Sequence, residues 1–425
     1  MDLVLLDALL DGRPVDVSIR AGMIHRIADA GAAPVPGPDA RAIDAGGLHL
    51  LPSLRNGHTH AAMTLFRGWG DDLPLMNWLQ ERIWPAEARM TADDVYHGTR
   101  LALVEMIRSG TTFLNDMYWH APAIARAVSE LGLRAHIGAA FVDLGQEAVA
   151  ARWWREMDAW LEQRNDWSDR VRATIAPHAV YTVNPANLRR MGELARTHDL
   201  LVHIHLSETR EEVERCRAEH GMRPAHLLEA VGLVDERLVA AHGVYLDEAE
   251  LALLGAAGAT VVTNPAANLK LATGGIFPYP DARRAGVRVV LGTDGVGSNN
   301  SLDLFEEMKL AALLQKHRAV DATVLPAREA LGLATTAPAE LFGPGSGRVA
   351  EGEPADLILV DLSGPATRPG HDLASDLVYA ANGSVVHTTI CDGRVLMYDR
   401  RIEVVDEDEV FREAEDAARR ITAGA

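Results

Sequence analysis

Two histidines separated by a single residue, His58 and His60, follow the apolar run LHLLPSL in the stretch LRNGHTHAAM. Alternate residues of a β-strand point to the same face of its sheet. Two imidazoles at the end of one strand can therefore bind one metal ion together, but they cannot complete a catalytic metal site. The remaining ligands must come from other parts of the chain.

Other residues that bind metals or transfer protons lie at or near the ends of apolar runs that are typical of strands. Taken singly, a histidine on an apolar strand is more often a hydrogen-bonded core residue, and an aspartate after Gly-Thr usually belongs to a turn. Because so many of them fall at matching strand ends, we interpret them as parts of one site. They are His178, His203, His205, Glu208, His242 and Asp294.

The side-chain types in this set indicate Zn²⁺, with Fe²⁺ as the second choice, because imidazole and carboxylate are present without thiolate. His58, His60, one histidine of the run LLVHIHL and Asp294 would supply three nitrogens and one oxygen. A metal of this kind lowers the pKa of a bound water toward about 7. Glu208, just past the same run, is predicted to transfer protons at this centre.

The run LLVHIHL offers two histidines, His203 and His205, and both should face the same side of the strand. His205 is nearer the carboxyl end of the strand and nearer Glu208. We therefore assign the metal to His205 and expect His203 to fill a lower layer of the core.

The segments that must position these residues alternate between β-like runs and amphipathic, helix-like stretches. One such stretch, TADDVYHGTRLALVEMIRSG, has Thr91 as its N-cap and Gly110 as its stop. Alternation of strands and helices predicts a parallel sheet, and eight repeats predict a TIM-like (β/α)8 barrel, whose active sites lie at the carboxyl ends of the strands. The eight runs span residues 47–57, 111–117, 134–141, 171–178, 200–206, 238–244, 260–265 and 287–295.

The two ends of the chain have a different pattern, with short alternating strands broken by turns. We expect them to form a small β-sandwich together, followed by a terminal helix. The predicted division is residues 1–55 for the first part of the sandwich, 56–345 for the barrel and 346–425 for the rest of the sandwich and the helix.

Composition favours a small-molecule enzyme over a nucleic-acid or membrane protein. The 425 residues are 48% hydrophobic and 24% charged, and 60 acidic against 41 basic residues give a net charge of −19, which repels nucleic acid and anionic membranes. Two cysteines are too few for a disulfide framework or a thiolate zinc site. The start of the chain lacks the features of a signal peptide and no run suits a membrane span, so we expect a cytoplasmic protein.

Several motifs resemble the amidohydrolase superfamily over nearly the whole chain, namely NGHTHAAM, APHAVYT, HIHLSET, AAHGV, NPAANLKLATG and LGTDGVGSNNSLDLFEEM. The closest resemblance is to the branch of the 5′-methylthioadenosine/S-adenosylhomocysteine deaminases and the triazine chlorohydrolases. It implies metal ligation by His58, His60, His205 and Asp294. It also implies proton transfer by Glu208, with His242 polarising the ring or assisting the water.

Two features qualify this resemblance. The chain has LPSLRNGHTH where the branch commonly has LPGLVNAHTH, and we expect these swaps to leave metal binding intact. Two-metal members of the superfamily bridge their ions with a carboxylated lysine from the middle strands of the barrel. Because this chain has no lysine before Lys270, a single divalent metal is predicted.

The reaction implied by the resemblance is hydrolytic deamination of an adenine nucleoside to its inosine analogue and ammonia. Glu87, in WPAE, would bind the ribose hydroxyls, and His178 would contact the sugar or the base. Trp69, with Phe66 and Trp84, lies in a segment that could cover the pocket. Arg152 is the nearest candidate for the amino-acid carboxylate of S-adenosylhomocysteine, but its surroundings match the family poorly, so methylthioadenosine or adenosine ranks ahead.

Other functions remain open at this point. The same scaffold could deaminate or dechlorinate guanine, a pterin or a triazine, although such a flat heterocycle has little use for Glu87. A non-catalytic relative or a metal-storage protein is disfavoured by the complete ligand set with Glu208. The cytidine-deaminase type is excluded, since its H-x-E and C-x-x-C motifs are absent. Related proteins often form dimers or tetramers, so a homo-oligomer is also allowed.

Overall fold

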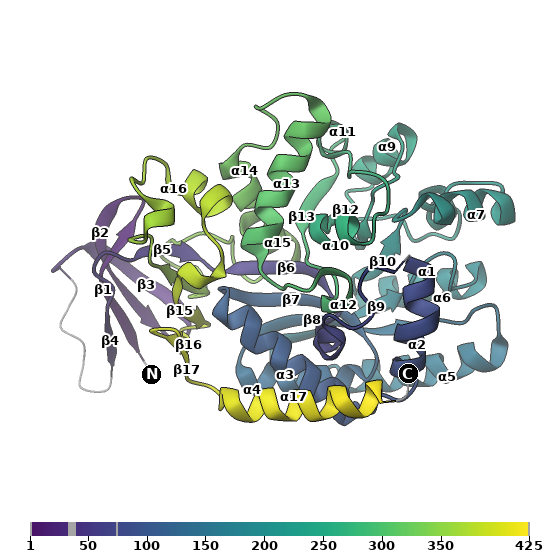
Figure 1. Ribbon diagram of the computed structural model, residues 1–425, viewed down its shortest axis with the longest axis horizontal. Helices are drawn as coiled ribbons and strands as arrows, with labels where there is room; N and C mark the ends of the chain where they lie inside the picture. Colours follow the sequence, from purple (N-terminus) through teal and green to yellow (C-terminus); the bar gives the residue numbers. More distant parts are fainter. Residues whose placement is uncertain (1, 33–39, 74, 424–425) are drawn as a thin grey trace.

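The computed structural model describes residues 2–32, 40–73 and 75–423, and one of its two sheets contains eight parallel strands in chain order (Figure 1). The amides of Thr293 and Asp294, just past the last strand, both donate to the carbonyl of His58 on the first, at 3.1 and 3.0 Å. The sheet is therefore a nearly closed TIM-like barrel, as the sequence predicts. Its strands are β6 (Leu54–Thr59), β7 (Thr111–Tyr118), β8 (Arg134–Phe141), β9 (Val171–Pro177), β10 (Val202–Leu206), β11 (Leu238–His242), β12 (Thr260–Thr263) and β13 (Arg288–Leu291).

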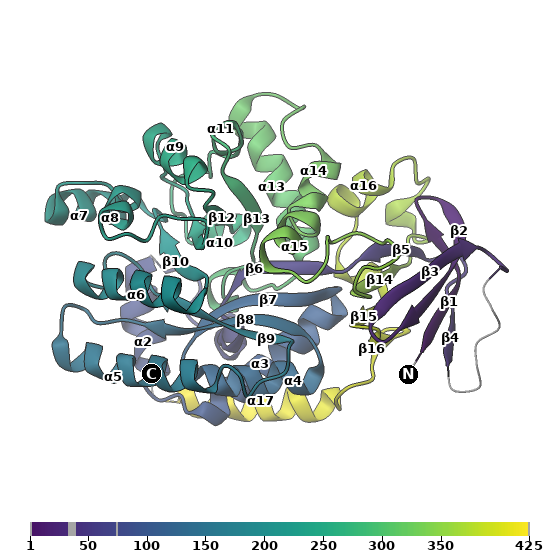
Figure 2. The same cartoon turned by 180° about the vertical axis from the view of Figure 1, so that it is seen from behind.

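Helices join the barrel strands and surround them (Figures 1 and 2). The predicted cap of the first long helix is confirmed, because the Thr91 hydroxyl accepts from the Asp94 amide while the Asp94 carboxylate accepts from the Thr91 amide. The helices are α1 (Leu75–Trp78), α2 (Trp84–Glu87), α3 (Ala92–Arg108), α4 (Ala121–Leu131), α5 (Glu147–Gln163), α6 (Pro185–His198), α7 (Arg210–His220), α8 (Pro224–Ala230), α9 (Glu248–Ala256), α10 (Pro265–Lys270), α11 (Tyr279–Arg284), α12 (Val296–Asn299), α13 (Leu304–Ala319), α14 (Ala327–Gly332) and α15 (Thr336–Phe342), with the short turns η1 (Ala61–Phe66) and η2 (Leu79–Ile83).

The inside of the barrel is layered. At the amino ends of the strands an apolar layer consists of Phe113, Val239, Val262, Val290 and the ring of Phe342 from α15. Near the carboxyl ends of β7, β8 and β9 the inner residues are Met117, Ala140 and Ala176. These three side chains are buried as well.

The two chain ends share a second, mixed sheet with its own hydrophobic core. The single run predicted at residues 47–57 is divided at Ser53, because β5 joins this second sheet while β6 joins the barrel. Antiparallel pairing of β5 with β14 joins the two ends of the chain, and the amide of Ile24 also bonds the carbonyl of Glu353 at 2.8 Å. The strands are β1 (Leu3–Leu10), β2 (Arg13–Arg20), β3 (Met23–Asp29), β4 (Arg41–Asp44), β5 (His49–Pro52), β14 (Leu357–Val360), β15 (Val386–Cys391), β16 (Arg394–Tyr398) and β17 (Arg401–Ile402).

The last helix, α17 (Glu407–Thr422), leaves this sheet and runs along α3 of the barrel (yellow in Figure 1). The short elements α16 (Leu373–Ser375), η3 (Pro365–Thr367), η4 (Asp376–Ala380) and η5 (Gly383–Val385) precede it. Arg420 of α17 donates to the Asp94 carboxylate at 2.9 Å, and Glu407 accepts from Arg108 at 2.6 Å. Ion pairs thus tether both ends of the helix to the barrel.

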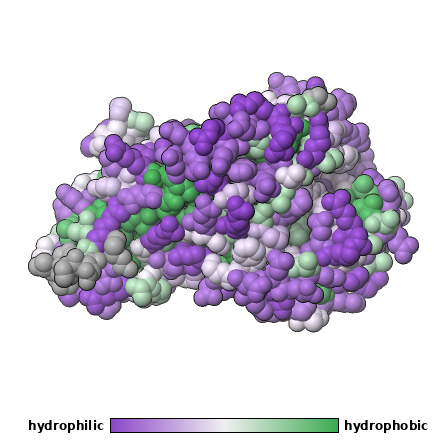
Figure 3. Space-filling model, turned by 90° about the horizontal axis from the view of Figure 1, so that it is seen from below, coloured by the Kyte–Doolittle hydropathy of each residue, from purple (hydrophilic) through white to green (hydrophobic). Residues whose placement is uncertain are grey.

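On the face seen in Figure 3 hydrophilic residues predominate, with hydrophobic residues in separate groups among them. Among the residues that the structure describes, no helix has the length and apolar character needed to span a membrane.

Candidate metal centre and active site

Four predicted ligands meet at the carboxyl end of the barrel. His58 is on β6, His60 directly follows it, His205 is on β10, and Asp294 lies three residues past β13. One ligand atom from each lies within 4.8 Å of the others. The Nε2 atoms of His58 and His60 are 3.2 and 3.3 Å from the same carboxylate oxygen, Asp294 Oδ1. The fold therefore forms a four-residue metal site.

The orientation of two rings fits a cation at this point. The Nδ1 of His60 lies 2.6 Å from the carbonyl of Met117, and the Nδ1 of His205 lies 2.8 Å from the carbonyl of His178. Because a carbonyl can only accept, both Nδ1 atoms carry the proton when the rings are neutral, and both Nε2 atoms present a lone pair. These two Nε2 atoms face each other at 3.2 Å. Burial opposes protonation, but Asp294 raises the pKa of His60 to about 9, so without a metal a proton lies on Nε2 of His60 between these groups, and a divalent cation bound by both rings would take its place.

His58 is held differently. Its Nδ1 lies 2.8 Å from Nε2 of His203, which is fully buried one layer lower in the barrel. When His58 uses Nε2 for a metal, its Nδ1 donates to His203, so the deeper histidine orients a ligand. Burial lowers the pKa of His58 to about 4 and that of His205 well below its usual value, which favours the neutral form that metals bind.

Asp294 supplies one oxygen to the cluster and uses the other within its own loop. Its Oδ2 accepts from the hydroxyl of Ser298 on α12 at 2.8 Å. Burial opposes its negative charge, but the adjacent imidazoles of His58 and His60 outweigh burial and hold the pKa of Asp294 well below its usual range. The carboxylate is therefore ionised and its Oδ1 is directed toward the cluster.

Glu208 and His242 lie side by side next to the ligands. Glu208 is two residues past β10, His242 is the last residue of β11, and Oε2 of the first is 3.9 Å from Nε2 of the second. Burial raises the pKa of Glu208, although His242 and His60 oppose the shift. A carboxyl group tuned in this direction can carry a proton nearer to neutral pH, which suits proton transfer. The side-chain oxygen of Asn268 on α10 lies 2.9 Å from Nδ1 of His242 and fixes its ring.

Sequence analysis missed Glu212, a buried carboxylate on the first turn of α7. Its two oxygens accept from consecutive amides, those of Ser207 and Glu208, both at 2.8 Å. Ser207 has a positive φ of 51°, so this carboxylate stabilises the strained turn that places Glu208 beside His242. Burial raises the pKa of Glu212 to about 7, although the two amide hydrogen bonds favour its ionised form. Glutamates are frequent in the first turn of a helix, so its role has no clear signal in the sequence.

The predicted ribose ligand Glu87 ends α2 and is half-buried. Its Oε1 accepts from the hydroxyl of Tyr118 at 2.7 Å. Burial raises the pKa of Glu87, while hydrogen bonds from Tyr118 and Trp119 and the proximity of His60 oppose the shift. Neither aromatic residue was predicted from the sequence, although Tyr118 is the last residue of β7 and Trp119 directly follows it.

His178 follows β9 and its ring centroid is 4.7 Å from that of His205. Its Nδ1 lies 2.9 Å from the hydroxyl of Thr182, which donates in turn to the carbonyl of Ala179. The hydroxyl therefore accepts from Nδ1, and Nε2 is left as an acceptor at the site. Burial lowers the pKa of His178 to about 3, so the ring is neutral.

The remaining candidates are three aromatic residues and one arginine. Trp69 is half-buried, with its ring centroid 5.8 Å from that of the fully buried Phe66. Trp84 is 38% exposed on α2. Arg152 is exposed on α5, where its guanidinium lies 3.3 Å from Glu156 of the same helix. Phe66 is thus a packing residue, and Arg152 has a carboxylate partner from its own helix.

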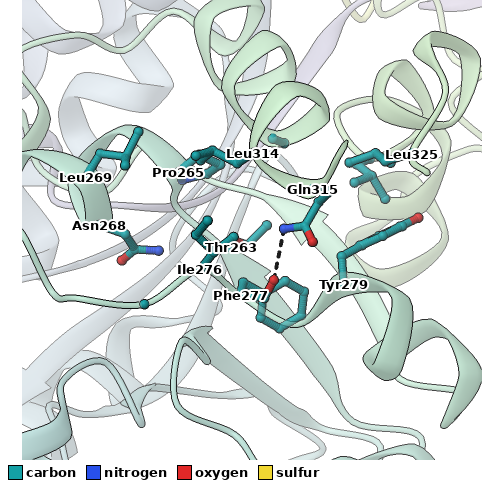
Figure 4. Close-up of a pocket in the computed structure, with 13 residues that line it drawn as sticks. Thr263, Pro265, Asn268, Leu269, Ile276, Phe277, Tyr279, Leu314, Gln315 and Leu325 are labelled. Atoms are coloured by element: carbon teal, nitrogen blue, oxygen red, sulfur yellow. Dashed lines mark hydrogen bonds between the residues drawn. The ribbon is translucent and has the colours of Figure 1, made fainter. Parts of the chain in front are cut away.

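Lys270 does not reach the ligand cluster. Its ammonium donates to Asp71 and Asn300, both at 2.7 Å, and so connects the segment after η1 with the segment after α12. A pocket lined by α10, the segment 275–279 and α13 lies nearby (Figure 4). None of the predicted catalytic residues lines this pocket. Asn268 lines it and also contacts the His242 ring.

Comparison with known proteins agrees with this arrangement. The model of the amidohydrolase family matches residues 49–396. A 5′-deoxyadenosine deaminase of Methanoregula boonei is 53% identical over 89% of this chain and 86% of that protein. A 5-methylthioadenosine/S-adenosylhomocysteine deaminase of Haloarcula marismortui is 44% identical over 97% of this chain and 95% of its own length.

Solved structures extend the likeness to the fold. The structure of an adenosine deaminase from Xanthomonas campestris with bound zinc has a TM-score of 0.93 and is 37% identical, covering 99% of both chains. An atrazine chlorohydrolase from Arthrobacter aurescens has a TM-score of 0.87 over 98% of this chain and 100% of that one, but only 23% identity. At this low identity, the comparison with the atrazine chlorohydrolase shows a similarity of fold alone.

Proposed function

The chain belongs to the amidohydrolase family, and from this premise we propose that it is a metal-dependent deaminase that converts an adenine nucleoside and water into the inosine analogue and ammonia. The observation that carries the proposal is the convergence of four ligands beside Glu208 and His242, with Glu87 nearby at the mouth of the barrel. The names of relatives at 44–53% identity, which are deaminases of 5′-deoxyadenosine and of methylthioadenosine or S-adenosylhomocysteine, support the substrate class.

We propose one Zn²⁺ per chain, held by His58, His60, His205 and Asp294. Three neutral imidazoles and one carboxylate suit Zn²⁺, with Fe²⁺ as the alternative. A similar deaminase structure with bound zinc supports this choice. The single-metal stoichiometry is supported by Lys270, the first lysine of the chain, whose ammonium contacts Asp71 and Asn300 and is not available as a bridge. When bound, the metal supplies Lewis acidity that makes water nucleophilic near neutral pH.

The proposed steps use the chain's own groups. Glu208 takes a proton from the attacking water and delivers it to N1 of the adenine ring as the new C6–O bond forms. Asp294 and His242 hold the water in line with C6, and His242 stabilises the negative charge that develops there. The new hydroxyl on C6 then gives up its proton to the amino group, the C6–N bond breaks, ammonia leaves, and the oxygen on C6 becomes the carbonyl of the inosine analogue. Burial raises the pKa of Glu208, which supports its role as the group that takes and returns the proton.

At the other end of the substrate, we propose that Glu87 accepts hydrogen bonds from the ribose hydroxyls and that Nε2 of His178 accepts one from the base or sugar. The half-buried position of Glu87 and its contacts with Tyr118 and Trp119 support this role, because a carboxylate can accept about four hydrogen bonds and these neighbours fix it while leaving capacity for a ligand. The likeness to the triazine hydrolase favours no triazine substrate, since it concerns the fold alone.

The test is an ultraviolet assay of the purified, zinc-loaded protein with 5′-deoxyadenosine, methylthioadenosine, adenosine, S-adenosylhomocysteine and guanine. We expect the adenine spectrum to change to that of hypoxanthine with at least the first two nucleosides. If none of the nucleosides reacts while guanine or another heterocycle does, the proposed substrate class is wrong. The amount of ammonia released should equal the amount of nucleoside converted.

A further inference from the structure

A tryptophan that the proposed reaction does not use lies at the mouth of the barrel. Trp119 directly follows β7, and its ring packs against Met117, Ala140 and Ala176. These three residues form the inner surface of β7, β8 and β9 toward the end where the ligands lie. Trp119 is half-buried, so part of the indole borders the mouth rather than the core.

Trp119 also lies beside the proposed ribose ligand. Burial raises the pKa of Glu87, and the Trp119 indole is close enough to its carboxylate to oppose that shift, while the preceding residue, Tyr118, donates to the same carboxylate at 2.7 Å. The residue is therefore placed beside the part of the site that would bind the sugar. In a nucleoside both the 3′-hydroxyl carbon and C5′ are bonded to C4′, so a group next to the ligand of the ribose hydroxyls is within reach of the 5′ substituent.

A second tryptophan extends this aromatic surface outward. Trp153 of α5 is half-buried and stacks on Trp119, with ring centroids 4.5 Å apart and an interplanar angle of 29°. The guanidinium of Arg152 lies 4.7 Å from the centroid of Trp153, but it pairs with Glu156. The surface beside the sugar is thus aromatic, and the cation at its outer edge is already paired with a carboxylate.

We propose that Trp119 and Trp153 form the subsite for the 5′ end of the nucleoside and that this subsite takes an uncharged, apolar 5′ group such as methyl or methylthiomethyl. This proposal rests on the proposed deaminase function and names its preferred substrates. A 5′-hydroxyl against indole loses hydrogen bonds to water without gaining a partner. A 5′ chain that carries an amino acid would bring a carboxylate beside Arg152, where Glu156 competes for the guanidinium.

The test compares kcat/KM for 5′-deoxyadenosine and adenosine in the wild type, Trp119→Ala and Trp119→Phe. We expect the wild type to prefer 5′-deoxyadenosine by about tenfold or more, because a hydrophobic pocket rejects an added hydroxyl by up to roughly a hundredfold. Trp119→Ala should reduce this preference to less than about threefold, chiefly by weakening 5′-deoxyadenosine, whereas Trp119→Phe should keep most of it because an aromatic surface remains.

The matched control is Trp167→Phe, since Trp167 precedes β9 at the opposite end of the barrel and should leave the substrate preference unchanged. If Trp119→Ala does not fold, Trp153→Ala on the outer side of the stack provides the same comparison with a smaller expected loss. An unchanged preference in a folded variant, or a wild type that prefers adenosine, would overturn the subsite. A wild type that deaminates no adenine nucleoside would instead overturn the function on which the subsite rests.

Discussion

The two ends of the same barrel strands are built for different purposes. At the amino ends, Phe113, Val239, Val262 and Val290 form a closed apolar layer. At the carboxyl ends, the barrel strands β10, β11 and β13 lead into His205, Glu208, His242 and Asp294. Both layers are buried, so burial alone does not distinguish them.

The backbone distinguishes them more clearly. Ser207, His242 and Asp294, all at or just past the carboxyl ends of strands, have positive φ values of 51°, 75° and 61°. Such conformations are costly for residues other than glycine and persist only where surrounding contacts enforce them. The apolar layer at the amino ends of the strands stabilises the fold. Part of that free energy offsets the cost of the strained turns and buried polar groups at the carboxyl ends. We therefore expect substitutions in the layer at the amino ends to change the free energy of unfolding, and substitutions at the carboxyl ends to change kcat.

The largest effect should follow from replacing Glu208 with Gln. The amide keeps the size of the side chain but cannot take a proton from water, so we expect kcat to fall about 10³-fold. Bound metal, measured by elemental analysis, should stay at the wild-type level because Glu208 is not a ligand. Glu211→Gln, an exposed neighbour on α7, is the control and should retain full activity. Substantial activity in Glu208→Gln would remove this residue from the mechanism.

The complementary test is Phe113→Ala, in the apolar layer at the amino ends of the strands. Phe113 is 2% exposed and stacks on Phe342 with ring centroids 4.9 Å apart. We expect the free energy of unfolding to fall by about 3–5 kcal/mol, as for other buried aromatic residues replaced by alanine. The kcat of the folded fraction should stay within about twofold of the wild type if the layers act separately. Denaturant titration and activity at low temperature measure both, and a large loss of kcat in folded protein would contradict the division.

Replacing Glu212 with Gln should have an intermediate effect on kcat. An amide offers one acceptor oxygen where the carboxylate has two, so the Ser207 or Glu208 amide loses its partner. We expect kcat to fall by about 10- to 100-fold through displacement of Glu208, with KM and metal content near wild type. Combined with Glu208→Gln, it should cause little further loss, since the two residues act as a unit. Independent, additive losses would show that Glu212 acts otherwise, and Glu214→Gln on the exposed face of α7 is the control.

The smallest effect should come from the ion pair between Arg420 of α17 and Asp94 of α3, which belongs to neither layer. Arg420→Ala removes the ion pair between α17 and Asp94, and the arginine side chain is 54% exposed. The Asp94 carboxylate is buried but keeps its hydrogen bonds from Thr91, and the arginine end of the pair is open to water, so we expect the pair to contribute about 1 kcal/mol to stability. A shift in the free energy of unfolding no larger than that, with unchanged kcat, is expected from denaturant titration and steady-state kinetics. A loss of several kcal/mol would mean that the attachment of α17 is essential to the barrel.

The sequence predicts the barrel and the metal ligands well because both depend on local patterns. Strand periodicity locates each run, and its last residues necessarily lie at one end of a parallel barrel. The sequence also favours His205 over His203 from its position in the strand. The division of the run 47–57 into β5 and β6 was not predicted, because an unbroken apolar pattern does not reveal that one strand changes sheets at Ser53.

The supporting contacts were missed for a different reason. Glu212 bonds the turn before it, and Trp153 contacts Trp119 from α5, the helix after the next strand of the chain. Such contacts depend on how helices pack against the barrel, which no periodicity encodes. Asn268 lies within the motif NPAANLK, but only the structure shows that it fixes the His242 ring.

The central claim is that one metal at His58, His60, His205 and Asp294 supports deamination. The most direct measurement is a zinc titration of chelator-treated protein, with bound zinc and the rate of adenine nucleoside deamination determined on the same samples. We predict that activity is negligible without metal and rises in proportion to bound zinc until it saturates at one ion per chain. Full activity in metal-free protein, or saturation only at two ions per chain, would contradict the account.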